Sequence, residues 1–159
     1  MALDATARKA NIMDSIKKYF VDSIQTESGI DITFDKRLST PPITQGHAVT
    51  RWVTCKIGPI VSDNLSTVFV KLYCCTRSDS EGFRLAQLRD TVVGYLTDTT
   101  QTDTMRRIVF YRSMPPGGGA WTAIGSFVID EWTESEDLEA PDSTKYITIT
   151  CRLRFGSKV

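Results

Sequence analysis

The sequence YITITCRLRF at residues 146–155 alternates five apolar side chains with tyrosine, threonine and arginine. A two-residue period places successive side chains on opposite faces of a sheet. One face of such a strand packs on a hydrophobic core, and the other face points away from it. The pattern therefore predicts a half-buried β-strand and a sheet with one packed face.

Five other segments have strand-like patterns. Residues 107–112 and 121–132 flank a break rich in proline and glycine, and they predict a hairpin with a flexible tip. Residues 47–57 and 68–74 each carry one apolar face and predict a second hairpin. Residues 30–34 alternate Ile and Phe with Asp and Thr, which predicts a short strand. With the strand at 146–155, these segments predict a mainly antiparallel sheet of about six strands.

Two segments have the period of an amphipathic helix. Between residues 4 and 25, apolar side chains recur at Ile12, Ile16 and Phe20. A second helix is expected from Ser78, because Ser78 and Glu81 have the spacing of a capping box. Its apolar face is expected to comprise Phe83, Leu85, Leu88, Val92, Tyr95 and Leu96. Strands broken by single helices indicate an α+β fold, here one domain over residues 1–159 with both helices packed on the sheet.

The composition narrows the classes of function. Lys plus Arg and Asp plus Glu both number 19, so no global basic field attracts nucleic acid or anionic membranes. The longest apolar runs are far shorter than the roughly 20 residues that span a bilayer. The N-terminus also lacks the apolar core of a secretion signal. We therefore expect no membrane partner and synthesis inside the cell.

Enzymatic or metal chemistry has few candidate residues. His47 is the only histidine, and the four cysteines lack C-x-x-C spacing, so zinc is not expected and the cysteines are expected to be buried and reduced. No G-K-S/T sequence follows the glycines at 117–119, which argues against a phosphate loop. Pairs among the carboxylates could support acid–base chemistry, but the sequence does not tell which share a cleft. No catalytic, metal or cofactor-binding residue is assigned.

Residues 130–142 contain seven carboxylates and no lysine or arginine. Such a segment is expected to repel itself and to protrude. It is either a solvated loop or an acidic surface that repels DNA phosphates or engages a basic partner. The candidates for an acidic surface or a lumen are Glu134, Glu136, Asp137 and Glu139.

Several aromatic side chains lie opposite the apolar faces of their predicted strands. Either a helix of the same chain or a neighbouring subunit is expected to cover them. Loops at residues 35–46, 97–104 and 114–120 are too polar or too rich in glycine to order themselves, so they are expected to contact partners. The candidate interface residues are Trp52, Phe69, Tyr73, Tyr111, Met114, Pro115, Pro116, Gly117, Gly118 and Trp121.

The order of elements resembles the tail terminator proteins of long-tailed, siphovirus-type bacteriophages. The resemblance rests on the patterns over residues 49–96, including DSEGFRLAQL at 79–88, and over residues 144–155. It implies a homohexameric ring that caps the tail tube, stops its polymerisation and joins the tail to head-completion or neck proteins. DNA then passes through the ring without specific binding. The resemblance also implies assembly in the host cytoplasm and a place at the tail–neck junction of the virion.

Two other classes of function stay open. One is another neck or tail component, such as a head-completion or tube protein, since tube proteins have related folds. The other is a small enzyme that uses a pair of carboxylates. A tube subunit stacks on copies of itself without limit, whereas a terminator stacks on one face only. Discrete rings without tubes would therefore favour the terminator.

Overall fold

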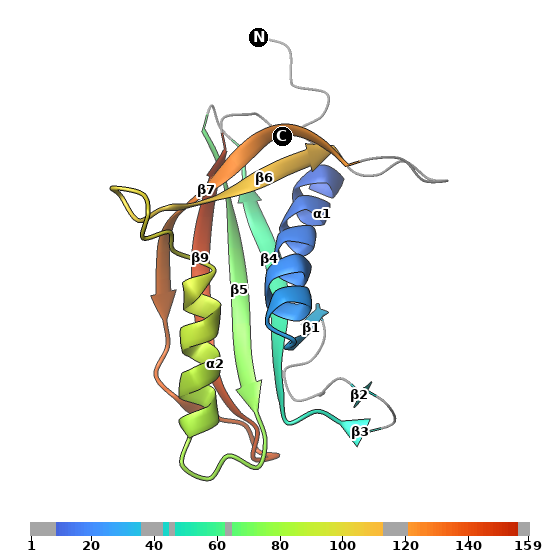
Figure 1. The fold of residues 1–159 in the computed structure, drawn as a ribbon, viewed down its shortest axis with the longest axis vertical. Coiled ribbons are helices and arrows are strands. Elements are labelled where there is room, and N and C mark those ends of the chain that lie inside the picture. Colours follow the sequence, from blue (N-terminus) through green and yellow to red (C-terminus); the bar gives the residue numbers. More distant parts are fainter. Residues whose placement is uncertain (1–8, 36–42, 45–46, 63–64, 113–120, 156–159) are drawn as a thin grey trace.

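The computed structural model describes residues 9–35, 43–44, 47–62, 65–112 and 121–155. These residues form an α+β fold, as the sequence predicted, with two helices beside a curled sheet (Figure 1). Helix α1 (Lys9–Phe20) continues into a π-helical segment, η1 (Val21–Glu27), and α2 is Phe83–Gly94. The strands are β1 (Asp31–Phe34), β2 (Ile43–Thr44), β3 (His47–Ala48), β4 (Arg51–Val61), β5 (Ser66–Thr76), β6 (Arg106–Arg112), β7 (Thr122–Glu134), β8 (Leu138–Glu139) and β9 (Lys145–Phe155).

Strand β9 organises the main sheet, whose order is β1-β4-β5-β9-β7-β6. All 11 residues of β9 pair with β5. On its other side, β9 pairs with β7 and with the short β8. The β1–β4 pair is parallel, and the other neighbours in this sheet are antiparallel. The strand predicted from residues 146–155 is thus confirmed, at the centre of the fold.

Both helices lie on the same face of the sheet (Figure 1), which we call the inner face. The alternating apolar residues of β9 point to this face and are buried there. Helix α1 contributes Ile12, Ile16 and Phe20 to the same core, and α2 contributes Leu85, Leu88 and Val92. The hydrophobic core therefore lies between the two helices and one face of the sheet.

The β6–β7 hairpin bends across α1 (Figure 1). The first half of β7 pairs with β6, and the second half pairs with β9. Ser15 of α1 is fully buried against the end of β6. Its hydroxyl donates to the carbonyl oxygen of Tyr111 at 3.2 Å and accepts from the Tyr111 amide at 2.8 Å. Helix α1 thereby satisfies the backbone of an edge strand that would otherwise be unpaired at this residue.

The start of α2 differs from the predicted capping box. The helix begins at Phe83, after Gly82 with φ 74°, and the Ser78–Glu81 box does not form. Instead the Asp79 carboxylate accepts hydrogen bonds from the backbone amides of Arg84 at 3.3 Å and Leu85 at 2.9 Å. Phe83 was expected on the buried face, but it is 68% exposed because it is the first residue of the helix.

The loop at residues 97–104 orders itself, contrary to the expectation from its composition. The Asp98 carboxylate accepts from the amide of Thr100 at 3.0 Å and from its hydroxyl at 2.6 Å. The Asp98 amide donates to the carbonyl oxygen of Thr104 at 2.9 Å, and the Arg106 guanidinium donates to the carbonyl oxygen of Thr97. Short polar side chains thus supply the hydrogen bonds that the loop backbone needs.

Candidate assembly surface

The outer face of the sheet is the face opposite the helices, and neither helix lies on it (Figure 1). At its centre the register places Lys56 of β4 opposite Lys71 of β5, and Phe69 opposite Arg152 of β9. Tyr73 lies opposite Thr148. The two lysines are exposed, and the aromatic residues are half-buried. The outer face therefore presents amphipathic and aromatic side chains on three adjacent strands.

Lys56 and Lys71 form a like-charge pair directly across two strands. The Lys56 ammonium lies 5.6 Å from the centroid of the Tyr73 ring. In the described part of the chain, neither lysine makes a salt bridge. Like charges placed directly opposite each other destabilise a sheet. The pair therefore costs stability in the isolated chain, and an acidic partner would offset that cost.

A shallow depression of about 220 Å³ lies beside the lysine pair. Phe69 is on one side of it, and Thr150 and Arg152 of β9 are on another. Glu131 and Thr133 of β7 complete the rim. An aromatic wall with a polar rim is typical of surfaces that receive a side chain from a partner protein.

Trp52, one of the predicted interface residues, is fully buried although it lies on the outer face. The Arg77 guanidinium lies 5.8 Å from the centroid of its ring. Arg77 in turn pairs with Asp142 at 2.7 Å. Trp52 is therefore not accessible to a partner in this structure, unlike Phe69 and Tyr73.

Tyr111 and Trp121 meet each other, but they lie on a different surface from Phe69 and Tyr73. Their ring centroids are 5.8 Å apart in an edge-to-face arrangement. The Lys18 ammonium of α1 lies 5.7 Å from the Tyr111 ring and 5.6 Å from the Trp121 ring, and it also pairs with Asp22 at 2.7 Å. The other predicted interface residues, Met114, Pro115, Pro116, Gly117 and Gly118, lie outside the described residues.

The acidic segment does not protrude as a whole, contrary to the prediction. Its first part is in β7, where Asp130 has a side chain only 8% exposed and contacts Arg152 at 3.0 Å and Arg154 at 2.6 Å. The Glu134 carboxylate accepts two hydrogen bonds, each of 2.8 Å, from the Arg89 guanidinium of α2. These hydrogen bonds hold the pKa of Glu134 below its usual value. Arginines from other elements thus neutralise much of the segment.

Three carboxylates of the segment keep their charge uncompensated within the described residues. Glu136, Asp137 and Glu139 are exposed, and none of them makes a salt bridge there. They lie in the connection between β7 and β8 and in β8 itself, and we call them the acidic turn. A Cβ added at Gly82 would lie 4.0 Å from the Asp137 carboxylate, so the acidic turn lies beside the start of α2 and its exposed Phe83.

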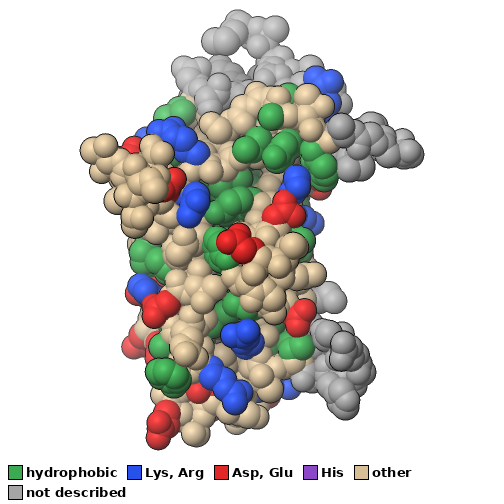
Figure 2. Space-filling view, in the orientation of Figure 1, with side chains coloured by type: hydrophobic (Ala, Val, Ile, Leu, Met, Phe, Trp, Pro, Cys, Tyr) green, Lys and Arg blue, Asp and Glu red, His purple; other side chains and the backbone are tan. Residues whose placement is uncertain are grey.

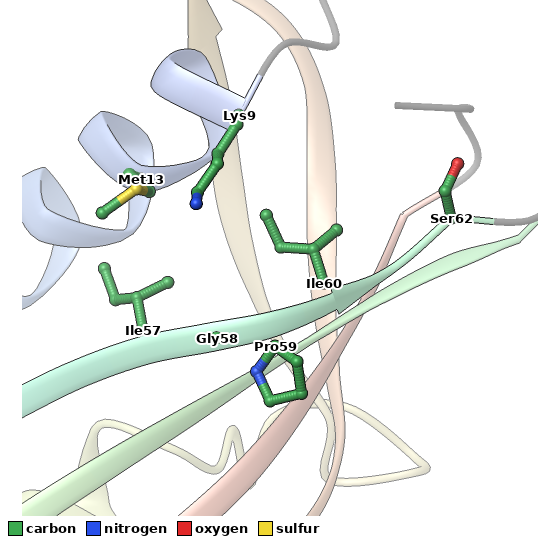
Figure 3. Close-up of a pocket in the computed structure, with 7 residues that line it drawn as sticks. All are labelled: Lys9, Met13, Ile57, Gly58, Pro59, Ile60 and Ser62. Atoms are coloured by element: carbon green, nitrogen blue, oxygen red, sulfur yellow. The ribbon is translucent and has the colours of Figure 1, made fainter.

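A pocket of about 480 Å³ lies between α1 and the bulged part of β4 (Figure 3). Met13 of α1 points toward Ile57, and Ile60 lies further along β4 (Figure 3). Its polar side chains, Lys9 and Ser62, lie at opposite ends (Figure 3).

The four cysteines are buried and free. Burial raises the pKa of Cys74 and of Cys151 to about 12, so both are neutral thiols at physiological pH. Within the described residues, no group of three or more His, Cys, Asp or Glu side chains is arranged to hold a metal ion. On the helical side of the molecule, charges of both signs are interspersed, and hydrophobic side chains gather over the β6–β7 hairpin (Figure 2).

Comparison with known proteins supports the fold alone. No protein family model matches the chain, and no curated protein matches its sequence. One solved structure, of a protein whose name describes no activity, superposes with a TM-score of 0.59 and 8% identity. The match covers 93% of this chain and 95% of the other. None of the described helices is long and apolar enough to span a membrane.

Proposed function

We propose that this protein is a structural virion protein, the tail terminator of a long-tailed bacteriophage. In this role it forms a ring that caps the tail tube, stops its polymerisation and joins the tail to the head-completion or neck proteins. The observation that carries the proposal is the outer face of the sheet, on the side away from both helices. There Lys56 and Lys71 lie opposite each other without a salt bridge in the described residues, next to half-buried aromatic side chains. The resemblance in element order supplies the specific role.

A ring is the closed assembly that suits such a surface. The outer face differs from the surfaces around it. A contact between the outer face of one copy and a different surface of the next copy is heterologous. A heterologous contact closes into a ring when the rotation between neighbours allows it, and otherwise it continues as a filament. The proposed ring has six copies, a number taken from the resemblance. Its place is the tail–neck junction of the virion, after assembly in the host cytoplasm.

The proposal assigns no catalytic residue and no cofactor. In its support, two carboxylates of the acidic segment form salt bridges between elements of the fold. Asp130 pairs with two arginines of β9, and Glu134 of β7 pairs with Arg89 of α2. These ion pairs give the carboxylates structural roles. The proposed partners are further copies of this chain, the tube protein and a neck protein, with DNA in the lumen and no membrane contact.

Native mass spectrometry and electron microscopy of the purified protein test the proposal. A terminator gives discrete rings, and addition of tube protein gives tubes of limited length with a ring at one end. A tube component, which is the alternative, gives stacks that lengthen with protein concentration. A protein that stays monomeric at high concentration, with tube protein present, would refute both.

A further inference from the structure

Two exposed surfaces of this chain carry opposite charges, and neither makes a salt bridge within the described residues. One is the lysine pair, Lys56 and Lys71, on the outer face. The other is the acidic turn, which comprises Glu136, Asp137 and Glu139. Most other acidic groups of β7 already hold an arginine, as Asp130 and Glu134 do. The two surfaces are therefore groups of like charge that the described salt bridges leave unpaired.

The fold keeps these surfaces apart. Lys71 is level with Thr150 of β9, whereas Glu139 is level with Lys145, near the start of that strand. Five residues along a strand correspond to about 16 Å, well beyond the reach of a salt bridge. The lysine pair also lies on the outer face, and the acidic turn lies at the end of the strands beside α2. A single copy therefore cannot bring its own surfaces together.

Each surface also carries an apolar feature that fits the other. Phe83, 68% exposed, lies next to the acidic turn at the start of α2. The depression of about 220 Å³ beside the lysine pair has Phe69 in its wall. Interfaces typically combine a central aromatic anchor with a polar rim. An exposed phenylalanine beside acidic side chains is chemically complementary to an aromatic depression beside two lysines. The one acidic side chain on the rim, Glu131, pairs with Arg152 at 3.2 Å.

We propose that the acidic turn and Phe83 of one copy dock on the lysine pair and the Phe69 depression of the next copy. The contact is heterologous, since the two patches belong to different parts of the chain. It rests on the proposed ring and names the interface that builds it. Nucleic acid is a weaker occupant for the outer face, because the acidic Glu131 lines the depression and the chain has no net positive charge.

Charge reversal on each side tests the contact. The first variant carries Lys56→Glu and Lys71→Glu, and the second carries Glu136→Lys and Asp137→Lys. Glu139 is left unchanged, because it lies opposite Lys145 and its reversal would create a new like-charge pair within the chain. All four altered side chains are exposed, so each variant is expected to fold, and thermal melting checks this.

Each variant alone is expected to assemble at least about ten-fold more weakly than the parent, because like charges then meet at every contact. An equimolar mixture is expected to recover rings, with the two variants alternating. A single chain with all four reversals is also expected to recover them, because its two patches are again complementary. Native mass spectrometry reads the composition of each ring, and Phe83→Ser should weaken assembly without lowering the melting temperature.

The outcomes separate this contact from the ring itself. If the parent forms rings and the Lys56→Glu, Lys71→Glu variant forms them equally well, the proposed contact is wrong and the ring stands. Folded variants that fail to recover in the mixture and in the four-substitution chain would also overturn the contact. A parent that never assembles overturns both proposals. Loss of binding to a duplex DNA oligonucleotide with unchanged assembly would instead assign the lysine pair to nucleic acid.

Discussion

Replacement of Ser15 by alanine tests how α1 closes the edge of the sheet. The Ser15 hydroxyl makes two hydrogen bonds with the backbone of Tyr111, at 3.2 and 2.8 Å, and the serine side chain is fully buried. Its removal leaves a backbone donor and acceptor without partners, at a cost of about 1–3 kcal/mol. Alanine returns about 0.5 kcal/mol through its higher helix propensity. We therefore expect a loss of about 0.5–2.5 kcal/mol.

Ser23→Ala is the matched control. Ser23 is also buried in the same helical segment, but its hydroxyl donates at 2.7 Å to the carbonyl oxygen of Tyr19, within the helix. No strand depends on that hydrogen bond, so this variant should melt close to the parent protein. For a chain of this size, Ser15→Ala should lower the melting temperature by about 1–10 °C at one fixed protein concentration.

Hydrogen exchange gives a local readout of the same change. Protection of the Tyr111 amide should fall in Ser15→Ala and stay unchanged in Ser23→Ala, because only Ser15 accepts from that amide. Equal melting of the two variants, with Tyr111 still protected in both, would refute the idea that α1 caps β6.

Two further predictions concern the start of α2 and the cysteines. Asp79→Ala should lower stability by about 1 kcal/mol, because it removes the acceptor for the amides of Arg84 and Leu85. Despite opposing desolvation, these hydrogen bonds lower the pKa of Asp79, so its contribution to stability is present at neutral pH and is lost as the pH falls through the folded-state pKa. When stability is measured against pH, Asp79→Ala should lack this acid-dependent loss. A stability–pH profile identical to that of the parent would contradict this role of Asp79. Thiol reagents should count four groups only after denaturation, and rapid reaction of any cysteine in the native protein would contradict its burial.

The sequence was sufficient to predict the elements whose periods are long and regular. Two patterns correspond to buried faces in the structure: the alternation over residues 146–155 and the four-residue spacing of Ile12, Ile16 and Phe20. Local hydrogen bonding was harder to predict. Asp79, and not Ser78, caps α2, because Gly82 with a positive φ places the helix start further along the chain. Short polar side chains have several backbone groups in reach, and spacing alone does not tell which one they choose.

The sequence could not predict how exposed each residue of the candidate surface is, because exposure depends on residues distant in the chain. Trp52 was expected on an interface, and the alternation of its strand does place it on the outer face. In the structure it is fully buried, with the Arg77 guanidinium 5.8 Å from its ring centroid, and the strand pattern does not reveal this contact. Phe69 and Tyr73, on the neighbouring strand, stay half-exposed. The strand period determines on which face of the sheet a side chain lies, whereas its tertiary neighbours determine how exposed it is.

The acidic segment shows how charge within a folded chain should be interpreted. Counted along the sequence, residues 130–142 form a self-repelling run. In the fold, Arg89 from α2 and Arg152 from β9 lie against Glu134 and Asp130 and remove most of that repulsion. A local excess of charge in the sequence therefore predicts a charged surface only when the salt bridges to distant residues are known. The acidic turn and the lysine pair are among the charges without a salt bridge in the described residues, and exposed charges that a chain does not pair with itself remain available to a second copy.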